Sequence, residues 1–357
     1  MSFEISEVVI PSSIGVSEAA DFIEMTRVRN EIEADAVGNY DLAFEADELL
    51  PGYQRQRWEP KRLFVARVEG SIVARAVYEI STPEDDSPTA WVVVEVLPAF
   101  RRQGIGSALL DTLLSLAAED GKTIIQGFSA QKAVDGPGLP APTGFGSVPR
   151  DSDATRWLLG RGFALEQVER MSRLDLPVDP ALLASMLSDA QAAAGPDYRV
   201  VTWTGRTPPE RLEAIALLRT RMGTDAPSAG LEADESVWTA ERVKDEDDRE
   251  ESSPRTMLTA LVEYVPTGDV AGFTELTVPV SLSRPVAQGD TIVLREHRGH
   301  RLGMLLKLAN ISHLASVAPG HPSITTYNAE ENRHMLSVNE AIGFVAWGYE
   351  GAWKKVL

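Results

Sequence analysis

The clearest pattern of hydrophobic positions lies in the first third of the chain. It starts as a continuous apolar run, Trp91–Leu97, which holds three consecutive valines and a single carboxylate, Glu95. Valine favours the pleated surface of a buried strand, and Pro98 ends that strand because proline has no N–H to donate. Apolar residues then recur at helical spacing from Ala108 to Leu116. The pattern predicts a strand, a tight turn and a helix.

The turn between this strand and this helix has the sequence RRQGIGS. Gly104 and Gly106 leave the first helical turn without side chains, so a ligand can approach the unpaired backbone N–H groups there. The helix dipole and the neighbouring Arg101 and Arg102 add positive charge. No Gly-Lys-Ser/Thr follows, as a P-loop would require, and the third glycine of a dinucleotide fingerprint is missing. The turn therefore predicts an anion site suited to a pyrophosphate.

The rest of the first half alternates between helical and strand-like spacing. The predicted elements are a helix within 16–38, a hairpin over 63–80, a strand over 122–128, a surface loop rich in Gly and Pro over 135–151, a short helix over 154–163 and a last strand over 164–174.

The second half repeats this order. The predicted elements are a linker helix within 177–196, a helix over 209–222, an exposed acidic segment over 234–253, a hairpin over 259–277, a strand–turn–helix over 290–310, a strand over 321–327, a helix over 329–344 and a final strand over 347–356. Gly106 and Gly303 are 197 positions apart. Such an internal duplication predicts two copies of one domain, 1–176 and 197–357, joined by the helix of 177–196.

Composition and charge narrow the function classes. The net charge of −19 repels nucleic acid and anionic lipid, and it favours a cationic substrate. The sequence has no cysteine, which excludes disulfides, thiolate metal sites and a cysteine nucleophile. It has no run of about 18 apolar residues that could span a membrane, and its N-terminus lacks the features of an export signal. We expect a cytoplasmic protein without nucleic-acid or membrane partners.

The strand and turn of the first half resemble motif A of the GNAT (general-control-related N-acetyltransferase) superfamily. The motif V-x-V-x-P-x-x-R-x-x-G-x-G-x-x-L-L falls on Val94, Val96, Pro98, Arg101, Gly104, Gly106, Leu109 and Leu110. The resemblance implies that acetyl-CoA is the co-substrate and that the backbone of Val94 and Val96 pairs with its pantetheine arm. It also implies that the turn binds the pyrophosphate through Arg101, Arg102, Gln103, Gly104, Ile105, Gly106 and Ser107.

Both halves resemble GNAT domains, so the expected fold class is α+β (mixed α/β), with two tandem domains, each a mixed, mostly antiparallel sheet flanked by helices. The arrangement is similar to that of mycothiol synthase. The resemblance places a second acetyl-CoA site on Val293, Arg298, Gly303 and Asn332. There Arg301 stands where the motif has its first glycine, and an arginine side chain crowds the approach. We expect weaker binding at this second turn.

Acetyl transfer to an amine needs a general base, because only the neutral amine is a nucleophile. Many GNAT enzymes use a glutamate near the motif strand, so Glu95 is the candidate base; the alternative is a carboxylate on the exposed side of a strand. The second half has Ile292 at this position. The family's usual tyrosine acid is replaced by Leu158 in the first half and by Asn339 in the second.

The sequence thus predicts an N-acetyltransferase that acts on a small, cationic amine, with the N-terminal half catalytic. One alternative is a non-catalytic acyl-CoA-binding module, which the missing tyrosines favour. Another is a catalytic C-terminal half, as in tandem relatives. His297 and His300 could bind a metal in principle, but without Cys or a His-Glu-x-x-His motif we expect no metal site. We expect a monomer whose two halves imitate a dimer.

Overall fold

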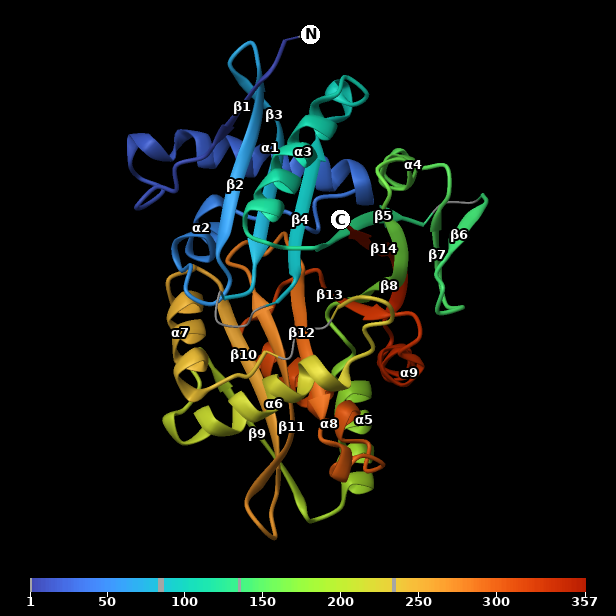
Figure 1. The fold of residues 1–357 in the computed structure, drawn as a ribbon. Coiled ribbons are helices and arrows are strands. Elements are labelled where there is room, and N and C mark those ends of the chain that lie inside the picture. The colour runs from blue at the N-terminus through green and yellow to red at the C-terminus, as the bar shows by residue number, and fades with distance from the viewer. Residues whose placement is uncertain (1, 83–86, 134–135, 233–235) are drawn as a thin grey trace. The chain divides into compact units, whose positions relative to one another are not determined.

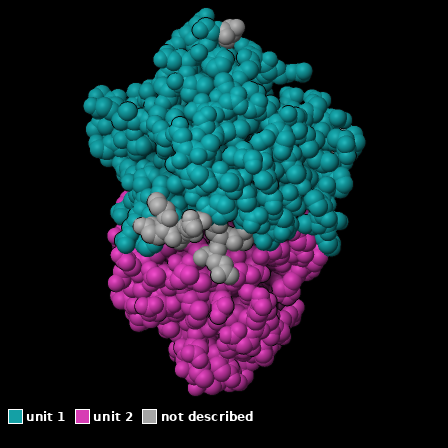
Figure 2. Space-filling view, viewed as in Figure 1, with its two compact units in different colours: residues 1–169, 228–234, 348–357 teal, residues 170–227, 235–347 magenta. Residues whose placement is uncertain are grey.

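The computed structural model describes residues 2–82, 87–133, 136–232 and 236–357. The chain divides into two compact units (Figure 2). Unit 1 comprises residues 1–169, 228–234 and 348–357, and unit 2 comprises residues 170–227 and 235–347. Two predicted segments begin at Asp135 and Asp234, which lie outside the described residues.

Unit 1 is built around one sheet with the strand order β1-β2-β3-β4-β5-β14, antiparallel except for the pair β4–β5 (Figure 1). Its strands are β1 Glu4–Glu7, β2 Lys61–Val68, β3 Ser71–Ile80, β4 Thr89–Val96, β5 Ile124–Lys132, the first part of β8 Ala164–Asp175 and most of β14 Val345–Val356. Its helices are α1 Ala20–Val37, α2 Ala46–Gln54, α3 Ile105–Glu119 and α4 Asp153–Gly160. The predicted loop 135–151 carries a small separate hairpin, β6 Gly138–Pro140 and β7 Ser147–Pro149.

Successive side chains along a strand point to opposite faces of the sheet, and in unit 1 apolar side chains lie on both faces. One face packs against α1 and α2, where Phe22 and Met25 of α1 are fully buried. The other face packs against α3, whose Leu109 and Leu113 are fully buried. Helix α1 ends at Gly38, which has a left-handed φ of 90° that glycine adopts without strain. Each face of the sheet therefore holds its own helices in a fixed place.

Unit 2 repeats this plan with the strand order β9-β10-β11-β12-β13, in which β9 to β12 are antiparallel and β13 is parallel to β12. Its strands are β9 Tyr198–Thr204, β10 Thr256–Tyr264, β11 Asp269–Val278, β12 Val286–Val293 and β13 Ser323–Ala329. Its helices are α5 Pro180–Ala194, α6 Leu212–Asp225, α7 Ala240–Glu251, α8 Leu302–Val317 and α9 Arg333–Ile342. Helices α5 and α8 cover one face of the sheet, and α6 and α7 cover the other.

The α+β class and the duplicated fold are confirmed. Among the described strands and helices, the sequence did not predict β1, α2, β9 or the hairpin of β6 and β7, which lies in the segment expected to be a loop. The acidic segment forms α7, which buries Arg242 and Val243. The helix of 177–196 is α5, and its Leu183, Ala190 and Ala194 belong to the core of unit 2.

The compact units do not follow the duplicated sequence halves at two strands. From Gly348 onward, β14 belongs to unit 1, where it pairs with β5. From Arg170 onward, β8 belongs to unit 2, next to β13. The limits 1–176, 177–196 and 197–357 remain a prediction about the duplicated sequence, whereas each compact unit contains a strand from the other half.

Candidate functional site

Strands β4 and β5 of unit 1 separate where the sequence places the site. Their parallel ladder joins Thr89–Trp91 to Ile124–Gln126, while β4 continues to Val96 and stays paired with β3 on its other side. Gly127 follows the last ladder pair, and a Cβ at that position would lie 2.5 Å from the carbonyl oxygen of Val92. Val94 and Val96 thus lie on the stretch of β4 that has left β5, where backbone groups can bind an extended ligand.

The turn after β4 has the shape that the sequence predicts. A 3₁₀ turn over Pro98–Phe100 is followed by two left-handed residues, Arg102 with φ of 63° and Gly104 with φ of 86°, and α3 begins directly after them. The first N–H groups of α3 have no partner within the helix and carry partial positive charge. A Cβ at Gly106 would lie 3.4 Å from Cγ2 of Val96, so a larger residue there would press on β4. The turn therefore brings α3 close to the opened strand.

The other predicted residues of this turn mostly shape it. Arg101 donates from Nε to the carbonyl oxygen of Val96 (3.0 Å) and forms an ion pair with Asp35 at the end of α1 (2.8 Å). Gln103 donates to the carbonyl oxygen of Ala99 (3.2 Å). Ile105 is 1% exposed and belongs to the core, so its side chain does not face a ligand. Ser107 accepts a hydrogen bond from the Trp157 indole (3.4 Å).

The turn of unit 2 has the same backbone shape. Arg298 donates from Nε to the carbonyl oxygen of Val293 (3.0 Å) and pairs with Asp225 at the end of α6 (2.8 Å). Gly299 and Arg301 are both left-handed, with φ of 89° and 54°. The order of glycine and arginine at the two left-handed positions is therefore reversed between the units. A Cβ at Gly303 would meet nothing within 4 Å, so α8 does not approach its strand there as α3 does at Gly106.

Glu95 lies in a buried network of four charged side chains. It forms an ion pair with Arg75, directly opposite it on β3, and its charge interacts with that of Glu33 of α1. Burial opposes ionisation, but Arg75 outweighs it and holds the pKa of Glu95 below its usual range. Burial and the neighbouring Glu95 carboxylate raise the pKa of Glu33 to about 7. Arg29, one turn earlier on α1, lies 3.6 Å from Glu33.

Apolar residues replace Arg75 and Glu95 at the same positions of unit 2. Phe273 and Ile292 occupy the positions of Arg75 and Glu95, and both are buried in an apolar core. The first helices of the two units align with an offset of 190 residues, so that Arg29 and Asp35 of α1 correspond to Arg219 and Asp225 of α6. With the same offset, Gly223 lies at the position of Glu33. In unit 2, Arg219 pairs instead with Glu275 on β11. Unit 2 has buried carboxyl groups of its own, Glu275 on β11 and Asp290 on β12, and burial raises the pKa of both.

The remaining predicted residues have structural partners. Asn332 caps α9 by accepting a hydrogen bond from the Met335 backbone N–H (3.2 Å). Asn339, at the position of the family's tyrosine, donates to Asn328 (2.6 Å). His297 shares a hydrogen bond with the Tyr198 hydroxyl (3.1 Å). Among the residues that the structure describes, no group of His, Cys, Asp and Glu side chains is arranged to hold a metal ion.

Sequence reasoning missed Glu33 and Arg75. Arg75 could have been found from the register of the predicted hairpin with the motif strand, because it lies opposite Glu95. Arg29 and Glu33 are four residues apart and therefore share one face of α1. Nothing in the sequence, however, indicates that this face covers Glu95.

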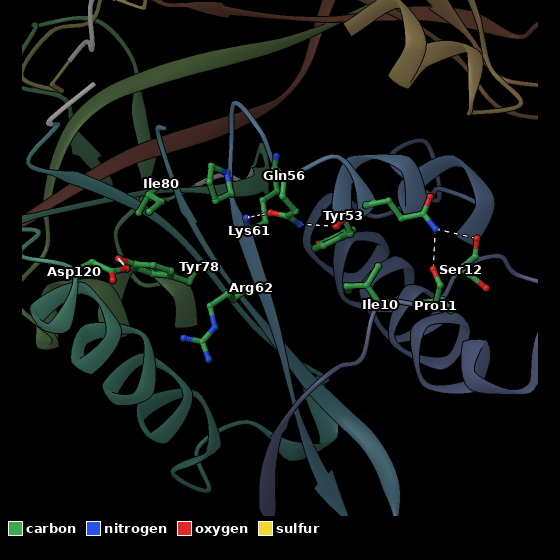
Figure 3. A pocket seen from close by; sticks show the side chains of 12 residues that line it. Ile10, Pro11, Ser12, Tyr53, Gln56, Lys61, Arg62, Tyr78, Ile80 and Asp120 are labelled. Carbon is green, nitrogen blue, oxygen red and sulfur yellow. Dashed lines mark hydrogen bonds between the residues drawn. The ribbon is translucent and has the colours of Figure 1, made fainter. Parts of the chain in front are cut away.

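A cavity of about 670 Å³ in unit 1 lies away from the turn (Figure 3). Ile80, which lines it, pairs with Ala90 near the start of β4, whereas the turn follows the end of that strand. Its polar side chains are already paired: Tyr78 donates to Asp120 (2.9 Å), and Arg62 binds Glu7. The cavity contains none of the predicted site residues.

The chain was compared with protein-family models and with solved structures. Residues 27–133 match the model of the acetyltransferase (GNAT) family. A tandem GNAT protein from the clavulanic acid biosynthesis pathway shares the fold with a TM-score of 0.74 at 23% identity, over 99% of this chain and 98% of that chain. A GCN5-related N-acetyltransferase from Sphaerobacter thermophilus has a TM-score of 0.62 at 13% identity, over 99% and 95% of the two chains. Among curated proteins, no significant sequence match was found.

Part of the first half therefore matches the acetyltransferase (GNAT) family model, and the chain as a whole shares the fold of the tandem GNAT protein. Each helix in the described part of the chain is too short or too polar to cross a membrane.

Proposed function

We propose that unit 1 binds acetyl-CoA at its β4–α3 turn and transfers the acetyl group to the amine of a small, cationic molecule. The observation that carries this proposal is the combination, in unit 1, of an opened motif strand, a glycine turn and a buried glutamate, Glu95, on that same strand. Unit 2 keeps the turn but has Phe273 and Ile292 in place of the charged residues. The proposal therefore assigns the chemistry to unit 1.

The proposed reaction is a direct attack on the thioester. The acetyl-CoA phosphates bind the first N–H groups of α3, and the pantetheine arm pairs with the backbone of Val94 and Val96. The acceptor arrives as an ammonium ion and gives one proton to Glu95, directly or through water. The neutral amine then attacks the carbonyl carbon, whose developing negative charge is stabilised by backbone N–H groups of β4. The C–S bond breaks, and the thiolate takes the second amine proton through solvent.

Charge near the network favours a cationic acceptor. Glu350 of β14 lies near enough to Glu169 and Glu33 for these carboxylates, together with burial, to raise its pKa to about 8. A positive amine bound among these carboxyl groups would relieve their mutual repulsion. The net charge of −19 would also attract a cationic molecule from solution.

One specific observation favours a non-catalytic alternative. Leu158 occupies the position of the family's acid, and the lowered pKa of Glu95 makes this carboxylate a weak base by itself. A unit with these properties could bind acyl-CoA without turning it over. A catalytic unit 2 is the further alternative, since its turn has the same shape.

The binding proposal predicts an asymmetry between two matched glycines. Gly106→Val should place a branched side chain between α3 and β4 and weaken acetyl-CoA binding more than roughly tenfold. The matched change Gly303→Val meets nothing within 4 Å at its Cβ, and it should leave the first bound molecule in place. Native mass spectrometry of both variants, titrated with acetyl-CoA, measures occupancy for each chain. If Gly303→Val lost the first bound acetyl-CoA molecule and Gly106→Val kept it, the binding site would have to be assigned to unit 2.

The catalytic proposal predicts that Glu95→Gln lowers kcat by about 10²- to 10⁴-fold, because the amide cannot accept the proton. Acetyl-CoA binding should persist, because the turn is unchanged. A thiol-release assay over a panel of small amines measures turnover, and native mass spectrometry of the same variant checks binding. If the wild type is active and the Glu95→Gln variant has the same rate, another group is the general base. A wild type that binds acetyl-CoA and acetylates no amine supports the non-catalytic alternative.

A further inference from the structure

An aromatic side chain is exposed on an interior strand of the unit 1 sheet. Phe128 lies on β5, between β4 and β14 (Figure 1), and it is 42% exposed. Its ring stacks on that of Trp91 of β4, with the ring centres 5.3 Å apart and the ring planes 8° from parallel. Among the described residues, neither ring belongs to the core under α3 or to the core under α1 and α2. An exposed aromatic pair of this kind is available to a ligand.

Phe128 lies at the opening between β4 and β5. The parallel ladder of these strands ends at Trp91↔Gln126, and Phe128 is the next residue of β5 on the same face. Counting on from that ladder pair along both strands, Glu95 of β4 lies level with Ala130 of β5. The face that carries the aromatic pair therefore also carries Glu95, the candidate base.

The cover over this face of β5 is interrupted at Phe128. At one end of the strand, Gln126 is fully buried, because its amide holds the backbone of Glu232, which belongs to unit 1. The Gln126 amide donates to the carbonyl oxygen of Glu232 (3.2 Å) and accepts from its N–H (2.7 Å). At the other end, Lys132 approaches Gly38, where α1 ends. The exposed ring of Phe128 lies between these two contacts, so a small molecule can reach it beside the opened strands.

A carboxyl group lies next to Phe128 on the other neighbouring strand. On β14, Ala352 is directly opposite Phe128 and has only a methyl group to place against the ring. Glu350, two residues earlier on β14, lies on the same face as a diagonal neighbour of Phe128. Burial and two neighbouring carboxylates raise the pKa of Glu350 to about 8. A positive group of a ligand would reverse that shift.

We propose that Phe128 binds a second positive group of the acceptor, so that the acceptor of unit 1 is a short molecule with a basic group at each end. This inference rests on the proposed function and names the substrate class for the same site. Phe128 takes no part in proton transfer, so it is a specificity-determining residue.

The arrangement provides a place for each basic group. The reacting amine gives its proton to Glu95. The second cation lies over the Phe128 ring, whose other face is stacked on Trp91, and the carboxylate of Glu350 adds charge of the opposite sign. Glu95 and Glu350 lie on the two strands that flank β5, two strand spacings or about 10 Å apart at the backbone. A diamine with a short carbon chain can bridge the two carboxylates across that distance.

The test compares diamines with monoamines. The probes are the terminal diamines of propane, butane and pentane, each beside the monoamine with the same carbon chain. In wild type, at least one diamine should have a kcat/KM roughly tenfold above that of its monoamine. In Phe128→Leu the KM for that diamine should rise about tenfold, with kcat changed less than about twofold, because the lost contact binds the acceptor and not the transition state alone. Values for the monoamine should not change.

Two variants control for effects on the fold. Phe128→Tyr keeps an aromatic ring and should keep the preference for the diamine. Phe145→Leu is the matched change in the connection between β6 and β7, since Phe145 is also 42% exposed, and it should leave the KM values of wild type unchanged. A preference for the diamine that persists in Phe128→Leu would overturn the proposal.

A binding measurement separates this inference from the proposed function. Isothermal titration calorimetry with the same diamines, with CoA present and above about pH 8, where Glu350 is ionised, needs no acetyl transfer. Phe128→Leu should raise the Kd of the diamine by roughly tenfold. If wild type binds a diamine through Phe128 and acetylates no amine, the proposed function fails and the cation site stands. If wild type acetylates diamines and monoamines with equal kcat/KM, the function stands and this inference fails.

Discussion

A chain that ends at Trp347 should lose the native fold of unit 1, although the residues removed are the last ten of the sequence. Those residues form the part of β14 that pairs with β5 from Gly348↔Lys132 to Val356↔Ile124. They also contain Trp353, which is 1% exposed in the core beneath α3 and donates to Ser129 (2.9 Å). Without them, β5 becomes an edge strand and this core is open. Amide hydrogen exchange should show lost protection in β4 and β5.

Single substitutions in β14 test the same dependence without removing the strand. Trp353→Ala should lower the free energy of unfolding of unit 1 by about 3–5 kcal/mol, because it leaves a large cavity. Val356→Ala in the same strand is the control, since Val356 is 68% exposed, and it should cost less than about 0.5 kcal/mol. If the truncated chain keeps full protection in β4 and β5, unit 1 does not depend on β14.

Lys307→Met should stabilise unit 2 by roughly 3 kcal/mol near neutral pH. Lys307 is 1% exposed within α8, where unit 1 has Leu110 at the equivalent position. Its Nζ lies 5.7 Å from the centre of the Phe344 ring. Burial lowers the pKa of Lys307 to about 7, far below that of a lysine in water. Methionine has a similar shape and no charge to bury.

The pH dependence has a definite sign. Between about pH 7 and 10.5 the unfolded chain binds the lysine proton and the folded chain does not, so the cost of Lys307 falls as the pH rises. The difference in unfolding free energy between Lys307→Met and wild type should therefore be largest below pH 7 and shrink towards pH 10. Urea unfolding at several pH values measures it, with the exposed Lys244→Met as the control. A difference that does not change with pH would mean that Lys307 titrates normally.

The sequence predicted most of the fold because its strongest signals are local. The valine run, Pro98 and the glycines of the turn act on their own neighbourhood, and β4, the turn and α3 appear as expected. Because the sequence pattern is duplicated, the same order of elements could be predicted for the second half. The short β1 and β9 were missed because their stabilising partners, β2 and β10, are distant in sequence.

The site was predicted less completely, for a related reason. The role of a glycine in a turn follows from its backbone, but the chemistry of Glu95 depends on which side chains approach it. Arg75 comes from another strand and Glu33 from a helix about sixty residues earlier. Their contacts depend on packing that no local spacing encodes. The roles of the turn residues and of Glu95 toward a ligand remain predictions.

The assignment of the C-terminal strand to unit 1 also has a consequence for protein synthesis. A ribosome makes the N-terminal part first, and domains usually fold in that order. Here every residue of unit 2 is synthesised before Gly348, whereas unit 1 still lacks its last strand when translation reaches that point. We expect unit 2 to complete its fold first on the nascent chain. A nascent chain that has not yet reached Gly348 would then hold an N-terminal half that still exposes β5.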